Sequence, residues 1–215
     1  MTADNDQDLG QDGQRMRDHW WWRPGWSVGR RFYTWHLTFE GQHDLHRLAG
    51  AYRSALAPLG PALTPVPDRW LHLTMQGVAF ADEITRADVE AVVEAARPRL
   101  AAVPAFGLRL GPETVDPEAV LLPAHPGAPV KDVRNAVRAA IGDALGDVPE
   151  RAEDFLPHVS VAYSAAEGPR TAVADALTGL DAPPAHVHVT AAQLIVIHRD
   201  RHMYEWEPHA SVPLG

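Results

Sequence analysis

Two short segments of this sequence share a pattern suited to acid–base chemistry at phosphorus. One begins at His72 and continues Leu-Thr-Met; the other begins at His158 and continues Val-Ser-Val. Each segment places a histidine, an apolar residue, a hydroxyl residue and another apolar residue in succession. The two histidines are 86 residues apart, so any shared chemistry requires the fold to bring them together.

The spacing within each segment has a structural meaning if both segments are β-strands. Side chains at positions i and i+2 of a strand point to the same face of the sheet. His72 and Thr74 then project together, and so do His158 and Ser160. Two such strands facing one cleft place two imidazoles and two hydroxyls around a single phosphorus atom.

Such a set of side chains suits the cleavage of a phosphodiester. A neutral histidine takes a proton from the attacking water or hydroxyl, and a protonated one gives a proton to the leaving oxygen. Histidine performs both roles near neutral pH because its reference pKa is about 6.5. The hydroxyls donate hydrogen bonds to the non-bridging oxygens as charge develops there. This chemistry requires no metal, and we expect neither a metal nor a cofactor.

The elements that must position these residues follow from the apolar pattern. Alternating apolar residues predict strands at 30–40, 70–80, 106–110, 120–123, 156–164, 184–198 (with a bend near 191–192) and 202–212. Helical spacing predicts helices at 44–57, 88–100, 129–145 and 169–177. Some neighbouring strands are spaced as hairpins. We therefore predict an α+β protein with largely antiparallel sheets, and a loop or hinge at 123–129.

Three more polar residues are candidates for the same cleft. His36 begins a third copy of the histidine–apolar–hydroxyl pattern, on the polar face of strand 30–40. We expect it to contact substrate; the alternative is a structural histidine on that face. Gln76 points into the cleft, as a substrate-binding residue, if its strand stays regular. Regular alternation after the second histidine likewise places Ser164 on the catalytic face and turns Tyr163 away.

The N-terminal region divides into a polar part and an aromatic part. Residues 1–18 are rich in Asp, Gln and Gly, which predicts a disordered acidic tail before a single domain at 19–215. Four tryptophans then occur within residues 20–26. They either pack against the domain as an ordered clasp or form part of a base-stacking platform.

Composition excludes several classes of function. The chain of 215 residues has no cysteine, which excludes disulfides and thiolate catalysis. A net charge of −9 disfavours broad duplex nucleic-acid binding. No signal-peptide pattern and no apolar run near the roughly 20 residues of a membrane span are present. We expect a cytoplasmic protein without membrane association, monomeric, whose partner is a nucleotide or RNA-end phosphodiester.

The neighbourhoods of the two motifs, Trp70 to Thr74 and Pro157 to Val161, resemble those of the 2H phosphoesterase superfamily. The closest resemblance is to its bacterial 2′-5′ RNA ligase and RNA 2′,3′-cyclic phosphodiesterase branch. It covers about residues 28–212 in the order of elements. It implies a bilobal fold, with two largely antiparallel sheets, flanking helices and the active site in a central cleft.

The resemblance also implies that His72 and His158 are catalytic and that Thr74 and Ser160 hold the phosphate. We predict a metal-independent phosphodiesterase acting on a 2′,3′-cyclic phosphate of a nucleotide or RNA end, with His158 as the base and His72 as the acid. The alternatives are 2′-5′ RNA ligation in the same site and a nucleotide-binding protein with little turnover. Many ligase-branch members carry an arginine soon after the second motif, and residues 162–164 here contain none, which weakens the case for an RNA end.

Overall fold

The computed structural model describes residues 14–153 and 155–215. Most of the predicted tail, residues 1–13, lies outside the described residues. The part of that prediction covering residues 14–18 is wrong. Strand β1 (Arg15–Met16) pairs with β9 (Gly168–Pro169), and the Met16 side chain is buried. An apolar side chain that reaches the core holds this stretch in place.

One lobe is built on a four-stranded antiparallel sheet. Its strand order is β12-β11-β2-β4. The strands are β2 (Phe32–Thr38), β4 (His72–Phe80), β11 (Ala191–His198) and β12 (Glu205–Pro213). Helices α3 (Arg86–Leu100) and α4 (Gly127–Leu145) pack against each other and against this sheet.

The other lobe is built on a six-stranded antiparallel sheet. Its order is β10-β5-β7-β8-β3, with β6 paired to β7. The strands are β3 (Leu63–Pro65), β5 (Phe106–Leu110), β6 (Thr114–Asp116), β7 (Ala119–His125), β8 (His158–Ser164) and β10 (Ala185–Val189). Helices α2 (His43–Leu56) and α5 (Arg170–Leu177) cover it, and 3-10 turns lie at Ala57–Ala62 and Asp68–Trp70.

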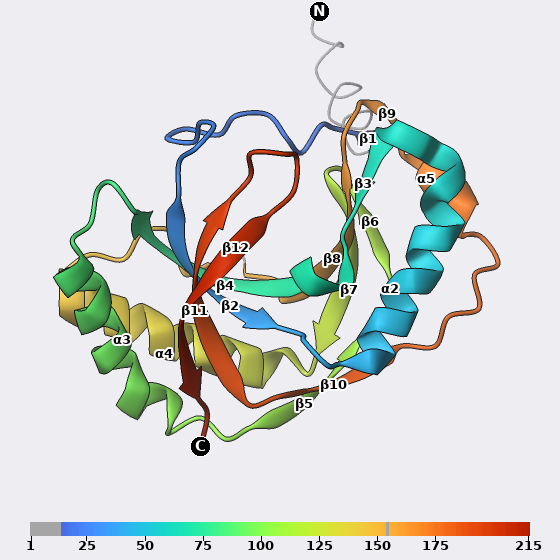
Figure 1. The fold of residues 1–215 in the computed structure, drawn as a ribbon. Helices are drawn as coiled ribbons and strands as arrows, with labels where there is room; N and C mark the ends of the chain where they lie inside the picture. Colours follow the sequence, from blue (N-terminus) through green and yellow to red (C-terminus); the bar gives the residue numbers. More distant parts are fainter. Residues whose placement is uncertain (1–13, 154) are drawn as a thin grey trace, which may run out of the picture.

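The chain passes repeatedly between the two lobes. Helix α2 follows β2 of the first sheet but contacts β8 and β10 of the second, whereas α4 follows β7 of the second sheet but contacts β4 of the first. Figure 1 shows α3 and α4 on one side of the molecule and α2 and α5 on the other. The predicted α+β fold, with two antiparallel sheets and flanking helices, is confirmed.

Two predicted boundaries change. The long strand 184–198 divides at Thr190, because β10 pairs with β5 in one sheet and β11 pairs with β2 in the other. Strand β7 and helix α4 occupy nearly all of the predicted hinge at 123–129. Among the described residues, no helix is long and apolar enough to cross a membrane.

The apolar residues that alternate with the motif histidines and hydroxyl residues are buried, and their burial fixes which way each face of the two motif strands points. Leu71, Leu73, Val159 and Val161 are each at most 1% exposed. Burying one such side chain contributes about 1.5–3 kcal/mol. A slip of one residue would turn all of them to the opposite face, so the register is strongly determined. The histidines consequently face away from the core of each lobe.

Candidate active site between the two sheets

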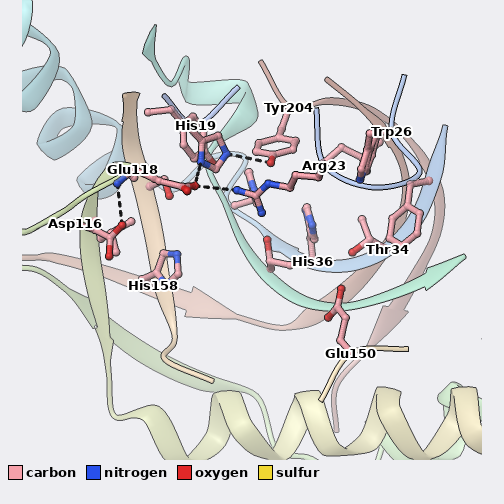
Figure 2. A pocket seen from close by; sticks show the side chains of 18 residues that line it. His19, Arg23, Trp26, Thr34, His36, Asp116, Glu118, Glu150, His158 and Tyr204 are labelled. Carbon is pink, nitrogen blue, oxygen red and sulfur yellow. Dashed lines mark hydrogen bonds and ion pairs between the residues drawn. The ribbon is translucent and has the colours of Figure 1, made fainter. Parts of the chain in front are cut away.

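A cleft of about 500 Å³ opens between the two sheets. Its walls come from β2 and β4 of one sheet, from β6 to β8 of the other, and from the N-terminal segment, which we define as residues 19–26. Figure 2 shows side chains from these elements converging on one space. Five of the six predicted site residues line it, namely His36, His72, Thr74, His158 and Ser160.

His72 and His158 are held in the same way on their two strands. The Nδ1–H of His72 donates to the Trp70 carbonyl at 2.8 Å, and that of His158 donates to the Leu156 carbonyl at 2.8 Å. A carbonyl oxygen only accepts, so each Nδ1 carries the hydrogen and each neutral ring keeps its lone pair on Nε2. Both imidazoles therefore present the nitrogen that exchanges protons to the cleft.

Each motif strand bulges directly after its hydroxyl residue. In β4, His36 pairs with Thr74 and Trp35 pairs with Gln76, which leaves Met75 as the extra residue. In β8, Leu121 pairs with Ser160 and the next partner of β7 is Ala162, which leaves Val161 unpaired. A bulge of this kind reverses the alternation of the residues that follow it.

The bulge in β4 overturns the prediction for Gln76. Its side chain is fully buried, donates to the backbone carbonyls of Gly77 and Pro149, and accepts a hydrogen bond from Arg138 of α4 at 2.6 Å. Gln76 thus lies between the sheet and α4 and is not a cleft residue. The next position, Gly77, faces the cleft side, where a Cβ would lie 2.7 Å from the Glu150 carboxylate.

The bulge in β8 overturns the corresponding expectation for Tyr163 and Ser164. Tyr163 lines the cleft, whereas Ser164 is buried and donates to the Ala166 carbonyl at 2.9 Å. The expectation assumed regular alternation, and the extra residue Val161 shifts the pattern by one position.

His36 is stacked on His72. The ring centroids are 4.5 Å apart and the planes are inclined by 3°. The His36 side chain is buried, and its Nδ1 has no hydrogen-bond partner in the described part of the chain. Burial, and secondarily the charge of a protonated His72, hold the pKa of His36 well below its usual range. His36 is therefore a neutral ring against which His72 is oriented.

Burial also determines the charge of His72. Its side chain is 7% exposed. Loss of hydration lowers the pKa of His72 to about 4, opposed by the Trp70 carbonyl, which raises it, and reinforced by a charged His158. His72 is thus neutral at pH 7 in the free protein, and its Nε2 is available to accept a proton.

Several cleft residues were not recognised from the sequence. His19 and Arg23 of the N-terminal segment both contact Glu118, at 3.0 and 2.9 Å, and Tyr204 donates to His19 Nε2 at 3.0 Å. Trp26 also lines the cleft, whereas Trp20 is buried beneath it. Trp20 therefore packs against the domain as the ordered clasp predicts, and the stacking of a base on these tryptophans stays a prediction.

In the described ranges, no group of three or more histidine, aspartate or glutamate side chains is arranged to hold a metal ion. The cleft lining combines imidazoles, hydroxyls and one guanidinium with the carboxylates of Asp116, Glu118 and Glu150. The imidazoles, hydroxyls and guanidinium are suited to a phosphate anion and to proton transfer.

The family model described as the 2′-5′ RNA ligase superfamily matches residues 41–201. The chain therefore belongs to the 2′-5′ RNA ligase superfamily, as the motifs indicate. Membership supports phosphodiesterase- or ligase-type activity in general.

Solved structures share the fold at low sequence identity. Escherichia coli LigT complexed with 3′-AMP aligns with a TM-score of 0.63 and 17% identity, over 86% of this chain and 98% of LigT. The protein TT0787 of Thermus thermophilus gives 0.63 and 19%, over 86% and 97%. A conserved Agrobacterium tumefaciens protein of unknown function gives 0.55 and 14%, over 83% and 85%. None of the curated proteins matched the chain.

Proposed function

We propose that this chain is a metal-independent phosphodiesterase that hydrolyses a 2′,3′-cyclic phosphate on a nucleotide or RNA end. The observation that carries the proposal is the matched pair of histidines. Each is anchored through Nδ1 by the carbonyl two residues before it, and both line one cleft with a hydroxyl residue two positions on. A base and an acid on either side of one phosphorus atom is the arrangement that ring opening needs.

We assign His72 as the base and His158 as the acid, the reverse of the assignment made from sequence. His72 is the more buried of the two and its lowered pKa keeps it neutral at pH 7. It takes a proton from the attacking water while the new P–O bond forms. His158, in its protonated form, gives a proton to the ribose oxygen as the ring P–O bond breaks. Thr74 and Ser160 donate hydrogen bonds to the non-bridging oxygens.

The nucleotide part of the proposal draws support from a relative. LigT has been solved with 3′-AMP and with phosphate. A nucleoside monophosphate phosphorylated on the ribose 2′ or 3′ oxygen is the product that opening a 2′,3′-cyclic phosphate leaves. A cleft of about 500 Å³ has room for a mononucleotide.

The family description favours one second candidate, which is 2′-5′ RNA ligation. The same two histidines serve it if a 5′-hydroxyl replaces water as the nucleophile and the ribose 3′ oxygen leaves. A third candidate is a nucleotide-binding protein with little turnover. Product analysis separates all three.

The test is a screen of 2′,3′-cyclic mononucleotides, RNAs with 2′,3′-cyclic ends and 2′-5′ oligonucleotides, read by mass spectrometry in the presence of EDTA. We expect ring opening by the wild type, and losses of about 10²–10⁴-fold in His72→Ala and His158→Ala with unchanged circular dichroism. Activity that survives in both variants, or that EDTA abolishes, would overturn the proposal.

We also infer that the protein works as a monomer, because one chain supplies both histidines to the cleft, and that it works in the cytoplasm, because a sequence without cysteine fits a reducing compartment. Light scattering of the purified protein and cell fractionation test this part of the proposal. A dimer required for activity would contradict it.

A further inference from the structure

The charge of the cleft poses a problem for an anionic substrate. Three carboxylates line it, those of Asp116, Glu118 and Glu150. Among the described lining residues, Arg23 is the one with a permanent positive charge. Phosphate groups in protein sites are commonly bound by guanidinium groups, whose planar donors match the phosphate oxygens. The described part of β8 after the second motif contains no arginine.

Arg23 reaches the cleft from a segment that is firmly attached to both lobes. Trp20 is 3% exposed, and its Nε1 donates to Thr64 at 3.2 Å. Its ring also packs against Tyr163 and Tyr204, with centroids 5.2 and 5.5 Å apart. The segment lies outside residues 41–201, the range that the family model matches. It forms a fixed wall of the cleft.

The Arg23 guanidinium has one donor with a protein partner and one without a partner among the described residues. One Nη donates to Glu118 at 2.9 Å, whereas Nε is buried and has no hydrogen-bond partner among the described residues. Figure 2 shows the guanidinium between Glu118 and His36, above the middle of the group of labelled side chains. A guanidinium that lines the cleft and has a donor without a partner among the described residues can bind an anion.

A chain of hydrogen bonds holds Arg23 in this position. Tyr204 donates to His19 Nε2, and His19 Nδ1–H donates to the Glu118 oxygen that also contacts Arg23. Burial, followed by the charges of Arg23 and Arg199, lowers the pKa of His19 to about 3. Because His19 is neutral, the direct ion pair of Glu118 is with Arg23, and this ion pair orients the guanidinium.

We propose that Arg23 binds the non-bridging phosphate oxygens of the substrate, and thus supplies from the N-terminal segment the cation that the second motif lacks. The ligand class is a nucleoside cyclic phosphate or its monophosphate product. This inference rests on the proposed function for its substrate, but the binding of a phosphate group can be tested without turnover.

The test compares Arg23→Gln with Arg31→Gln, using calorimetric binding of inorganic phosphate and of a nucleoside 3′-monophosphate. Arg31 is a matched control, because its side chain is 40% exposed against 38% for Arg23, pairs with Asp200 at 3.0 Å and lies outside the cleft. We expect Arg23→Gln to weaken both ligands about ten- to a hundredfold, Arg23→Lys to weaken them less, and Arg31→Gln to change them less than about twofold. Raising the salt concentration should weaken binding in the wild type more than in Arg23→Gln.

Equal binding by Arg23→Gln and wild type, equal losses in the two glutamine variants, or no phosphate binding by the wild type overturns the inference. A loss of binding in Arg23→Gln accompanied by a lower melting temperature counts as support only if Arg23→Lys is fully folded and also weaker. Phosphate binding that depends on Arg23, without any ring opening, would contradict the proposed function and leave the inference about Arg23 supported. Ring opening that depends on His72 but not on Arg23 would contradict the inference about Arg23 and leave the proposed function supported.

Discussion

At the scale of single residues, the two catalytic histidines differ in their surroundings. His72 is covered by the stacked ring of His36 and by Trp206, whose ring centroid lies 5.3 Å from its own. His158 stands at the start of β8 and is less buried. Loss of hydration disfavours the charged form of His72, whose pKa is lowered to about 4.

This difference predicts distinct responses to the leaving group. A nucleoside 3′-(4-nitrophenyl) phosphate reacts through its own 2′-hydroxyl and expels nitrophenolate, which needs no proton. In this reaction the two histidines exchange the roles that they have in ring opening, because the ribose oxygen is now the nucleophile: His158 takes the proton of the 2′-hydroxyl and His72 faces the leaving group. We expect His72→Ala to retain activity within about tenfold of wild type on this ester, because nitrophenolate needs no proton. His158→Ala should still lose about 10²–10⁴-fold, because the 2′-hydroxyl still has to be deprotonated.

The measurement is the initial rate of nitrophenolate release, with the 2′,3′-cyclic nucleotide as the reference substrate. If His158→Ala is the variant that retains activity on the nitrophenyl ester, His158 faces the water site and the assignment made from sequence is restored.

At the scale of elements, the two bulges decide which side chains of β4 and β8 reach the cleft. Thr74 and Gln76 are two positions apart on one strand, yet Thr74 lines the cleft and Gln76 binds Arg138 and the Pro149 carbonyl. The bulge at Met75 separates a residue that faces substrate from a residue that joins the sheet to α4.

The pair Thr74→Ala and Gln76→Ala tests this division. Gln76→Ala leaves buried donors and acceptors unpaired, so we expect it to lower the free energy of unfolding by about 1–3 kcal/mol and to change kcat/KM by less than about threefold. Thr74→Ala should show the opposite, with little change in stability and a lower kcat. Urea unfolding measures the free energy of unfolding, and steady-state kinetics measure kcat and kcat/KM. A large loss of kcat/KM in a Gln76→Ala variant of unchanged stability would show that Gln76 acts on substrate and would contradict this division.

At the scale of the whole molecule, three buried neutral histidines couple stability to pH. Burial lowers the pKa of His19 to about 3 and of His72 to about 4, and it lowers that of His36 as well. The unfolded chain binds protons at a pKa of about 6.5. Between the folded and unfolded pKa values the unfolded state holds more protons, so stability must decrease as the pH falls.

We therefore expect the free energy of unfolding to decrease from pH 6.5 to pH 5, by at most about 1.4 kcal/mol per histidine and pH unit. Urea unfolding followed by tryptophan fluorescence measures this slope. His36→Gln removes one of the three titrating groups. It should reduce the slope of the free energy of unfolding against pH by at most about 1.4 kcal/mol per pH unit. A stability that is constant or that rises on acidification would contradict the burial of these rings in neutral form.

Local pattern predicted much of the fold and part of the candidate site. Helices α2, α3, α4 and α5 begin and end within three residues of the predicted bounds, because an amphipathic period of 3.6 residues is a local signal. Alternation likewise placed each motif histidine on one face with its hydroxyl residue. The division of 184–198 between two sheets was only expected as a bend, since strand partners are distant in sequence.

What the sequence by itself determined is the pairing of His72 with Thr74 and of His158 with Ser160, since residues two positions apart on a regular stretch of strand share a face. The tertiary structure decided the rest of the site. Bulges arise from pairing with another strand, and they moved Gln76 out of the cleft and Tyr163 into it. Contacts 95 residues apart brought Arg23 to Glu118, and no local period encodes a contact of that range.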